Sequence, residues 1–163
     1  MRITKQRYAF ITILAAWLVT GTLDITTALI YYPVKYNITE TQLLQNIASG
    51  LLGEKAFDGG LWMAALGLAI HYCIALFWTI VYFIGYPVIT MLWRNRIVAG
   101  IAYGIVVWLA MNLVILPLSN VNRSPSDFIQ SLIGAAILMI CIGLPNSTII
   151  GKYYAKRHTF LKN

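Results

Sequence analysis

Four long apolar stretches constrain the fold of this chain more than any other feature of its sequence. They cover about residues 8–32, 60–84, 97–118 and 127–151. A helix needs roughly 20 mainly apolar residues to cross the hydrocarbon core of a bilayer, and each stretch is long enough. Only 10% of the residues are charged, whereas a soluble domain has about a quarter. We therefore predict an all-α integral membrane protein, in which residues 1–163 form one domain with a four-transmembrane-helix bundle.

The basic residues predict how this bundle is oriented. One side of the predicted membrane carries nine of them: Arg2, Lys5, Arg7, Arg94, Arg96, Lys152, Lys156, Arg157 and Lys162. The other side carries three: Lys35, Lys55 and Arg123. Because Lys and Arg are enriched in cytoplasmic segments, we expect a multi-pass protein with cytoplasmic N- and C-termini. The basic residues behind the net charge of +7 cluster at the chain ends and in one loop rather than over a face. This is the pattern of membrane topology, so we expect the lipid bilayer, and no nucleic acid, as a partner.

The connection between the first two membrane helices predicts a helix of its own. Thr39 and Gln42 have the spacing of a capping box, which satisfies the free amides at a helix start. Leucine and isoleucine then recur at helical spacing, while Gln45, Asn46 and Ser49 lie largely on the other side. We predict a short amphipathic helix at about residues 39–53 on the outer face. The sequence leaves open whether it is a functional lid or a cap that only packs on the bundle.

Asp24 is the carboxylate that the first apolar stretch carries in its interior. An ionised side chain in the membrane costs at least about 2.5–3.5 kcal/mol, so a partner is expected. Its neighbours on the same helix face are mostly small or carry hydroxyls, namely Trp17, Thr20, Gly21, Thr27, Ala28 and Tyr31. Small residues allow helices to approach closely and hydroxyls satisfy polar groups, so this face is predicted to point into the bundle.

His71 is the matching polar group on the second membrane helix. Asp24 lies nine residues before Pro33, and His71 lies eleven residues after Gly60. At about 1.5 Å per residue, antiparallel helices would bring the two side chains to similar depths. The pair could be a polar clasp that fixes helix register. It could also carry protons, because imidazole titrates near neutral pH; a third possibility is that the two side chains do not meet.

Further candidates extend this intramembrane polar site and the helix contacts around it. Asn112 and Gln130 are predicted towards the same leaflet, where they could line an outward-opening cavity with Asp24 and His71, or bond between helices. Thr20 and Thr27 complete the polar set. The candidate helix-packing residues are Gly21, Gly67, Gly100, Gly104 and Gly134. Gly100 and Gly104 have the four-residue spacing of a close-packing motif, for which we favour a contact within the chain over a dimer.

Signatures of catalysis and metal binding are missing from the sequence. There is no HExxH, no GxSxG and no phosphate-binding glycine loop. His71 and His158 are the only histidines, and they belong to different depths of the predicted bundle. We therefore expect no catalytic residue, no metal and no cofactor.

Several stretches carry a resemblance that covers most of the chain. They are LDITTAL, LLQNIASGLLGEKAFDGG, ALGLAIHYCIALFW, YGIVVWLAMNLVILPLS and IGLP. In these the chain resembles a family of small, uncharacterised bacterial inner-membrane proteins with four predicted spans. The resemblance implies a shared fold, a bacterial inner-membrane location, and a common outer-side feature made of Asp24, His71, Asn112 and the LQNIASG segment. The family has no established activity, so it implies no substrate.

Two functions are predicted, and an intramembrane enzyme is kept in reserve. The first is a non-catalytic accessory or assembly partner of a membrane complex, since no catalytic motif is present. The alternative is a small proton-linked transporter or permeation unit that uses Asp24 and His71. Other membrane-protein subunits or further copies of the chain are possible partners. A packed centre around Asp24 and His71 would favour the accessory, and a cavity there would favour the transporter.

Overall fold

The computed structural model describes the backbone of residues 2–93, 95–121 and 128–162, and the side chains of residues 6–93, 95–121 and 128–156. Within these ranges the chain is helical and has no strand. Four helices are long and apolar enough to cross a membrane: Gln6–Tyr36, Gly60–Leu92, Arg96–Leu118 and Phe128–Lys156. The predicted fold class is confirmed. Arg94, Arg123 and Asp127, on which parts of the sequence prediction rest, lie outside the described residues.

Two of the membrane helices are continuous and two contain a wider turn. The continuous ones are α1 (Arg2–Tyr36) and α3 (Gly60–Leu92); between them lie α2 (Glu40–Leu52) and a 3₁₀ turn (Gly53–Phe57). The third membrane helix consists of α4 (Arg96–Ala110), a π-helical turn (Met111–Ile115) and α5 (Leu116–Leu118). The fourth consists of α6 (Phe128–Leu138), a second π-helical turn (Met139–Gly143) and α7 (Leu144–Lys162). The helices α1 and α3 run past the predicted ends, because an apolar stretch marks only the segment inside the hydrocarbon.

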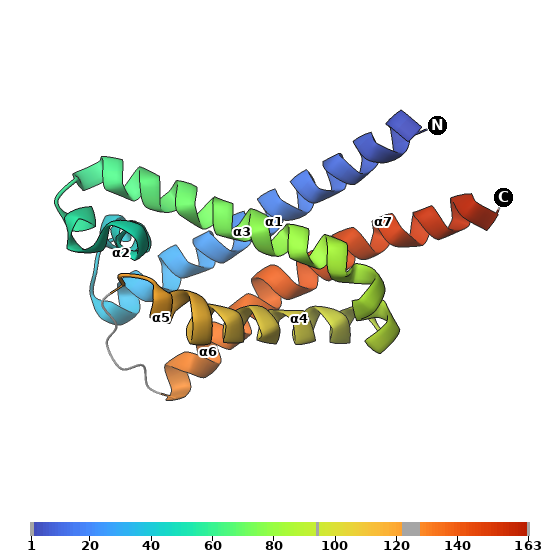
Figure 1. Cartoon of the computed structure of the whole chain (residues 1–163). Helices are drawn as coiled ribbons and strands as arrows, with labels where there is room; N and C mark the ends of the chain where they lie inside the picture. The colour runs from blue at the N-terminus through green and yellow to red at the C-terminus, as the bar shows by residue number, and fades with distance from the viewer. Residues whose placement is uncertain (1, 94, 122–127, 163) are drawn as a thin grey trace.

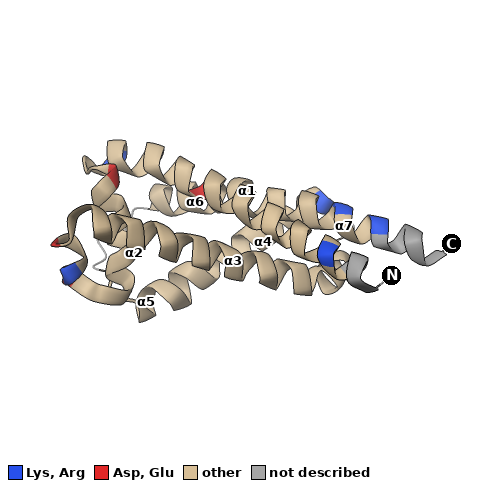
Figure 2. Cartoon of the chain, turned by 90° about the horizontal axis from the view of Figure 1, so that it is seen from above, with Lys and Arg blue, Asp and Glu red and all other residues tan. Residues whose placement is uncertain are grey.

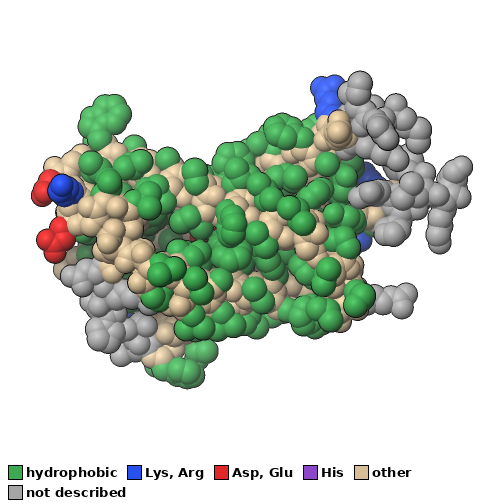
Figure 3. Space-filling view, viewed as in Figure 1, with side chains coloured by type: hydrophobic (Ala, Val, Ile, Leu, Met, Phe, Trp, Pro, Cys, Tyr) green, Lys and Arg blue, Asp and Glu red, His purple; other side chains and the backbone are tan. Residues whose placement is uncertain are grey.

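The four membrane helices form an elongated bundle with α2 at one end and both termini at the other (Figure 1). Charged residues gather at these two ends (Figure 2), and the long surface between them is mainly apolar (Figure 3). Large apolar side chains such as Phe10, Ile84 and Ile140 are more than half exposed. A continuous exposed apolar surface is suited to contact with lipid rather than water.

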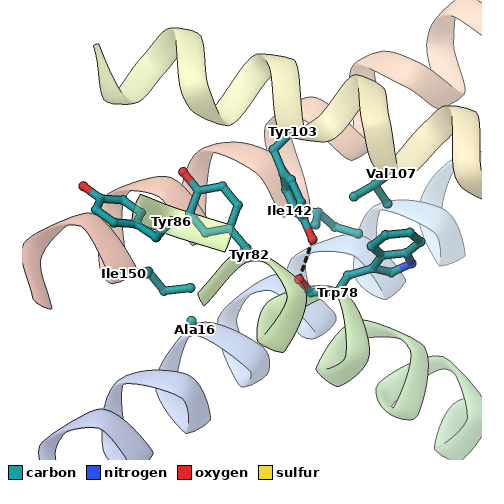
Figure 4. Packing of buried hydrophobic residues seen from close by; sticks show 8 residues of the cluster. All are labelled: Ala16, Trp78, Tyr82, Tyr86, Tyr103, Val107, Ile142 and Ile150. Carbon is teal, nitrogen blue, oxygen red and sulfur yellow. Dashed lines mark hydrogen bonds between the residues drawn. The ribbon is translucent and has the colours of Figure 1, made fainter. Parts of the chain in front are cut away.

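Aromatic residues dominate the buried core. The core cluster consists of Ala16, Trp78, Tyr82, Tyr86, Tyr103, Val107, Ile142 and Ile150 (Figure 4). Tyr82 and Tyr103 meet edge to face, with ring centroids 4.6 Å apart, which is a favoured aromatic geometry. The hydroxyl of Tyr103 donates to the backbone carbonyl of Trp78. These contacts hold the third membrane helix against α3.

Each π-helical turn directly precedes a Leu-Pro pair. The N–H of Leu116 donates to the carbonyl of Met111, and the N–H of Leu144 donates to that of Met139. Pro117 and Pro145 follow at once. A proline ring lacks an N–H and clashes with the carbonyl four residues earlier. Widening the preceding turn by one residue relieves that clash without ending the helix.

Gly100 and Gly104 face the second π-helical turn of the same chain. A Cβ at Gly100 would lie 2.9 Å from the carbonyl oxygen of Gly143. A Cβ at Gly104 would collide with the backbone of Met139. The third and fourth membrane helices therefore pack backbone to backbone at these two glycines.

The helix α2 begins as the sequence predicts, but it buries its smaller and more polar face. The capping box is confirmed: Gln42 N–H donates to Thr39 Oγ1 at 3.2 Å, and Thr39 N–H donates to Gln42 Oε1 at 2.8 Å. Gln45, Ala48 and Ser49 are buried, whereas the Leu51 side chain is 68% exposed. The small face points inward because α2 lies directly on α3.

Gly67 and Gln45 explain how α2 can lie so close to α3. At Gly67 the carbonyl of Leu44 occupies the space that a Cβ would need. Gln45 Nε2 donates to the carbonyl oxygens of Phe57 at 3.4 Å and Gly60 at 3.2 Å. This amide therefore ties α2 to the start of α3.

Removing the cap should loosen α2 without disturbing the membrane helices. Thr39→Ala deletes the acceptor for the Gln42 amide, and loss of such a cap costs about 1 kcal/mol. Hydrogen exchange of the α2 amides in detergent micelles should accelerate by roughly fivefold, since about 1.4 kcal/mol corresponds to a factor of ten. Thr41→Ala, the same change inside the helix, is the matched control. Equal exchange rates in both variants would show that this cap does not stabilise α2.

Candidate functional site

A cavity of about 240 Å³ lies beneath α2 and reaches into the bundle. All four membrane helices contribute to its wall, together with α2 and residues 119 and 121 of the connection before α6. Its polar lining side chains are Asp24, Asn46, His71 and Ser119, and most of the remaining wall is apolar. At about 30 Å³ per molecule, this volume could hold about eight waters.

Asp24 of α1 presents a carboxylate to this cavity. Within the described part of the chain, this carboxylate has no hydrogen bond and no ion pair. Three titratable side chains are close enough to interact with it electrostatically: His71 of α3, Tyr32 of α1 and Cys141 of the second π-helical turn. The carboxylate is thus held between helices that come from distant parts of the sequence.

His71 reaches the same cavity but bonds to the backbone of α1 rather than to Asp24. Its Nε2 lies 3.0 Å from the carbonyl oxygen of Gly21. A carbonyl oxygen can only accept, so Nε2 must carry the hydrogen of this bond. The other ring nitrogen, Nδ1, is then the one that can gain or lose a proton. Among the described residues, no ion pair joins Asp24 and His71.

The α1–α3 interface that positions these two groups is close and polar. A Cβ at Gly21 would lie 2.9 Å from the ring of Tyr72, so only glycine fits without displacing that ring. Trp17 Nε1 donates to the Tyr72 carbonyl at 2.7 Å. Thr20 is fully buried, donates to the Ala16 carbonyl at 2.9 Å, and lies 3.4 Å from the hydroxyl of Thr79. This packing fixes the height of His71 relative to Asp24.

Trp78 adds a polar group that the sequence analysis did not single out. Its side chain is 7% exposed and lines the cavity, and its Nε1 has no hydrogen-bond partner within the described residues. Leaving a buried donor unpaired costs about 1–3 kcal/mol, so water or a ligand in the cavity would stabilise it. Residues 71, 75 and 78 share one helix face, and this spacing was the available sequence signal. Asn46 was not named as a candidate site residue by itself, but it belongs to the LQNIASG segment that the resemblance grouped with Asp24 and His71.

The other predicted polar residues make helix contacts outside the cavity wall. Thr27 Oγ1 donates to the Leu23 carbonyl at 2.8 Å and lies 3.4 Å from Cys141 Sγ. Gln130 Oε1 accepts from the Tyr31 hydroxyl at 2.8 Å. Asn112 Nδ2 donates to the Trp108 carbonyl at 2.9 Å. None of the three side chains lines the cavity, so the structure brings together only Asp24 and His71.

Glycines predicted to serve helix packing differ in how tightly they are enclosed. Gly21, Gly67, Gly100 and Gly104 leave no room for a Cβ at ordinary contact distance. Gly134 is different, because a Cβ there would lie 3.6 Å from the Trp108 indole nitrogen and 3.7 Å from the Tyr32 hydroxyl. A methyl group would fit at this position.

A second group of buried polar side chains lies in the half of the bundle nearer the termini. Asn146 is fully buried, and neither polar atom of its side chain has a partner in the described ranges. Ser147 is also fully buried and donates to the Arg96 carbonyl at 2.6 Å. The Tyr82 hydroxyl lies close to Ser147.

The bundle therefore contains two regions of buried polar side chains. The cavity has titratable groups, a free donor and apolar walls, which is the usual make-up of a small-molecule site. In comparisons with known proteins, no family model, no curated protein and no solved structure matches this chain.

Proposed function

We propose that this protein is a small proton-linked transporter or permeation unit that works through Asp24 and His71. The observation that carries this proposal is the cavity of about 240 Å³ with both side chains in its wall. Both groups can hold a proton, and ionisable residues inside a membrane usually mark a pathway. The accessory or assembly role predicted from the sequence stays a prediction, because no observation tests it.

Polar side chains between the cavity and the end of the bundle with the termini support a continuation of the proton route. Thr20 and Thr79 place their hydroxyl oxygens 3.4 Å apart. Tyr82 and Ser147 follow towards the termini, with Asn146 buried next in sequence to Ser147. Buried polar groups without partners are costly in an apolar medium, and water between these side chains would satisfy them while passing protons.

We place the cavity on the periplasmic side of a bacterial inner membrane, with both termini in the cytoplasm. The described basic residues at the end with the termini are Arg7, Arg96, Lys152 and Lys156. The opposite end combines basic and acidic residues, namely Lys35, Lys55, Glu40, Glu54 and Asp58 (Figure 2). This asymmetry follows the preference of basic residues for the cytoplasm.

Cysteine labelling in intact bacterial cells tests that orientation. In a chain with Cys73 and Cys141 replaced by alanine, Asp58→Cys should react with a membrane-impermeant maleimide added outside. Lys152→Cys should react only after the membrane is opened. Both positions are exposed, so each serves as the control for the other. The reverse labelling pattern would place the cavity on the cytoplasmic side.

Reconstitution into liposomes tests the function directly. With a potassium gradient and valinomycin as the driving force, a pH-sensitive dye inside the liposomes should report proton entry faster than in protein-free liposomes. Equal rates in both preparations, at verified incorporation, would contradict the proposal. If the protein also copurifies with other membrane subunits in mild detergent, the accessory role would replace it.

A further inference from the structure

We propose that the cavity binds a small organic ammonium ion whose body is apolar. This inference rests on the proposed function, because it names the solute class for the same cavity. The ion would place its charge next to Asp24 and its carbon groups against the apolar wall. A bound ion and a bound proton would then compete for one carboxylate.

Charge complementarity is the first reason. Among the residues that the structure describes, Asp24 is the only carboxylate that lines the cavity, and no lysine or arginine lines it. His71 contributes an imidazole ring to the same wall. The remaining titratable groups that face Asp24 are Tyr32 and Cys141. None of the described groups supplies a permanent positive charge. The negative charge of Asp24 must therefore be neutralised by a proton or balanced by a bound cation.

The composition of the wall disfavours divalent metal ions and anions. Ca²⁺ takes six to eight oxygen ligands, and Mg²⁺ demands six in near-ideal octahedral geometry. The lining side chains with oxygen atoms, among the described residues, are Asp24, Asn46 and Ser119, and the Ser119 hydroxyl already donates to the Leu116 carbonyl at 2.8 Å. Anions would be repelled by the Asp24 carboxylate, and the apolar wall would not weaken this repulsion. An organic ammonium ion needs few oxygen ligands and gains from apolar contact.

The apolar and aromatic lining favours a cation with a hydrocarbon body. Ile74 and Leu138 line the cavity together with Trp78. A tryptophan ring attracts cations, by roughly 0.5–2 kcal/mol depending on how far water is excluded. The unpaired Trp78 N–H can hold a water molecule or an acceptor atom of the ligand. A volume of about eight waters corresponds to a ligand of roughly ten non-hydrogen atoms.

The ammonium group could come from two sources, namely a free solute or a phosphatidylethanolamine headgroup. The roof of the cavity is formed in part by α2, and Leu51 of α2 both lines the cavity and is exposed. A headgroup could therefore approach from the bilayer side, and a solute from the aqueous side. The shared feature is the ammonium group at Asp24.

Equilibrium dialysis of labelled benzyltrimethylammonium tests the inference. This probe keeps its charge at every pH and has about the required size. The full-length protein in nanodiscs of phosphatidylglycerol, which has no ammonium group, should bind it saturably. Asp24→Asn should weaken binding at least tenfold, whereas Asp24→Glu should retain binding, so that loss of charge is separated from loss of folding. Asp58→Asn, an exposed carboxylate on the same side, should bind like the unmodified protein.

Neopentylbenzene, which has the shape of the probe without its charge, should not displace it. The inference is overturned if the neutral molecule competes as well as the cation, or if Asp24→Asn binds with unchanged affinity. Displacement by added phosphatidylethanolamine would identify the lipid headgroup as the natural source, and unchanged binding would identify a free solute. Proton flux without cation binding would contradict this inference but not the proposed function. Cation binding without proton flux would contradict the proposed function but not this inference.

Discussion

Asp24→Asn should reduce proton flux through the reconstituted protein to the rate of protein-free liposomes. Asparagine has nearly the same size and shape as aspartate, but its amide cannot take up and release protons near neutral pH. Within the described part of the chain, no second carboxylate lines the cavity and could take over its role. The readout is the rate of internal pH change in liposomes under a fixed potassium gradient.

The expected loss is complete because the proposed route needs both Asp24 and His71. His71 Nε2 is engaged with the Gly21 carbonyl, which leaves one ring nitrogen for proton transfer. Below the cavity the polar side chains are hydroxyls and amides, such as Thr20, Thr79 and Asn146. These groups can relay protons through water but do not hold them near neutral pH.

Asp58→Asn is the matched control, since it removes an exposed carboxylate at the same end of the bundle, and it should leave the flux unchanged. His71→Gln is a second test, because the glutamine amide can keep a donor near Gly21 while it cannot titrate. It should lower the flux and preserve the thermal unfolding temperature. Unchanged flux in Asp24→Asn would show that Asp24 does not lie on the route. A large loss of stability in both variants would instead support a polar clasp.

The depth of the polar site could be predicted from the sequence, but its bonds could not. A fixed rise per residue and antiparallel helices are enough to bring Asp24 and His71 to one level. Side-chain torsions decide which atom each group reaches, and they depend on packing that the sequence pattern does not contain. His71 therefore meets the carbonyl of Gly21, one helical turn before Asp24.

The orientation of α2 shows why apolar periodicity is a weaker guide near a membrane. In a water-soluble protein the apolar face of a helix turns inward. Near a membrane the apolar face of a helix can contact lipid instead. The Leu51 side chain of α2 is accordingly exposed, while Gln45 and Ala48 are buried. The more reliable signal was the small residue Gly67 on α3, since small residues mark close helix contacts in membranes.

The two π-helical turns were also missed, although the sequence carries a signal for them. Both Leu116-Pro117 and Leu144-Pro145 occur within long apolar stretches, where a broken helix would leave backbone groups unsatisfied. A widened turn is one way to keep the helix intact. The turns help to shape the candidate site, because Met111, Ile115 and Ile142 from these turns line the cavity.

Gly104→Ala should destabilise the bundle by about 1–3 kcal/mol, the usual effect of forcing a methyl group into a filled core. The new Cβ would collide with the backbone of Met139, which cannot yield unless the fourth membrane helix moves. Since Leu138 and Ile142 of that helix line the cavity, the same shift should also deform the candidate site. Reversible unfolding in mixed detergent micelles measures the free energy change.

Gly134→Ala is the matched control, because the same methyl group meets only ordinary contacts there, at 3.6 Å and beyond. Replacing a helical glycine by alanine lowers the entropy of the unfolded chain and favours the helix by about 0.5–1 kcal/mol. The two variants should therefore change the free energy of unfolding in opposite directions, although the chemical change is identical and both glycines lie in membrane helices. If both are equally stable, the third and fourth helices do not pack backbone to backbone at Gly104.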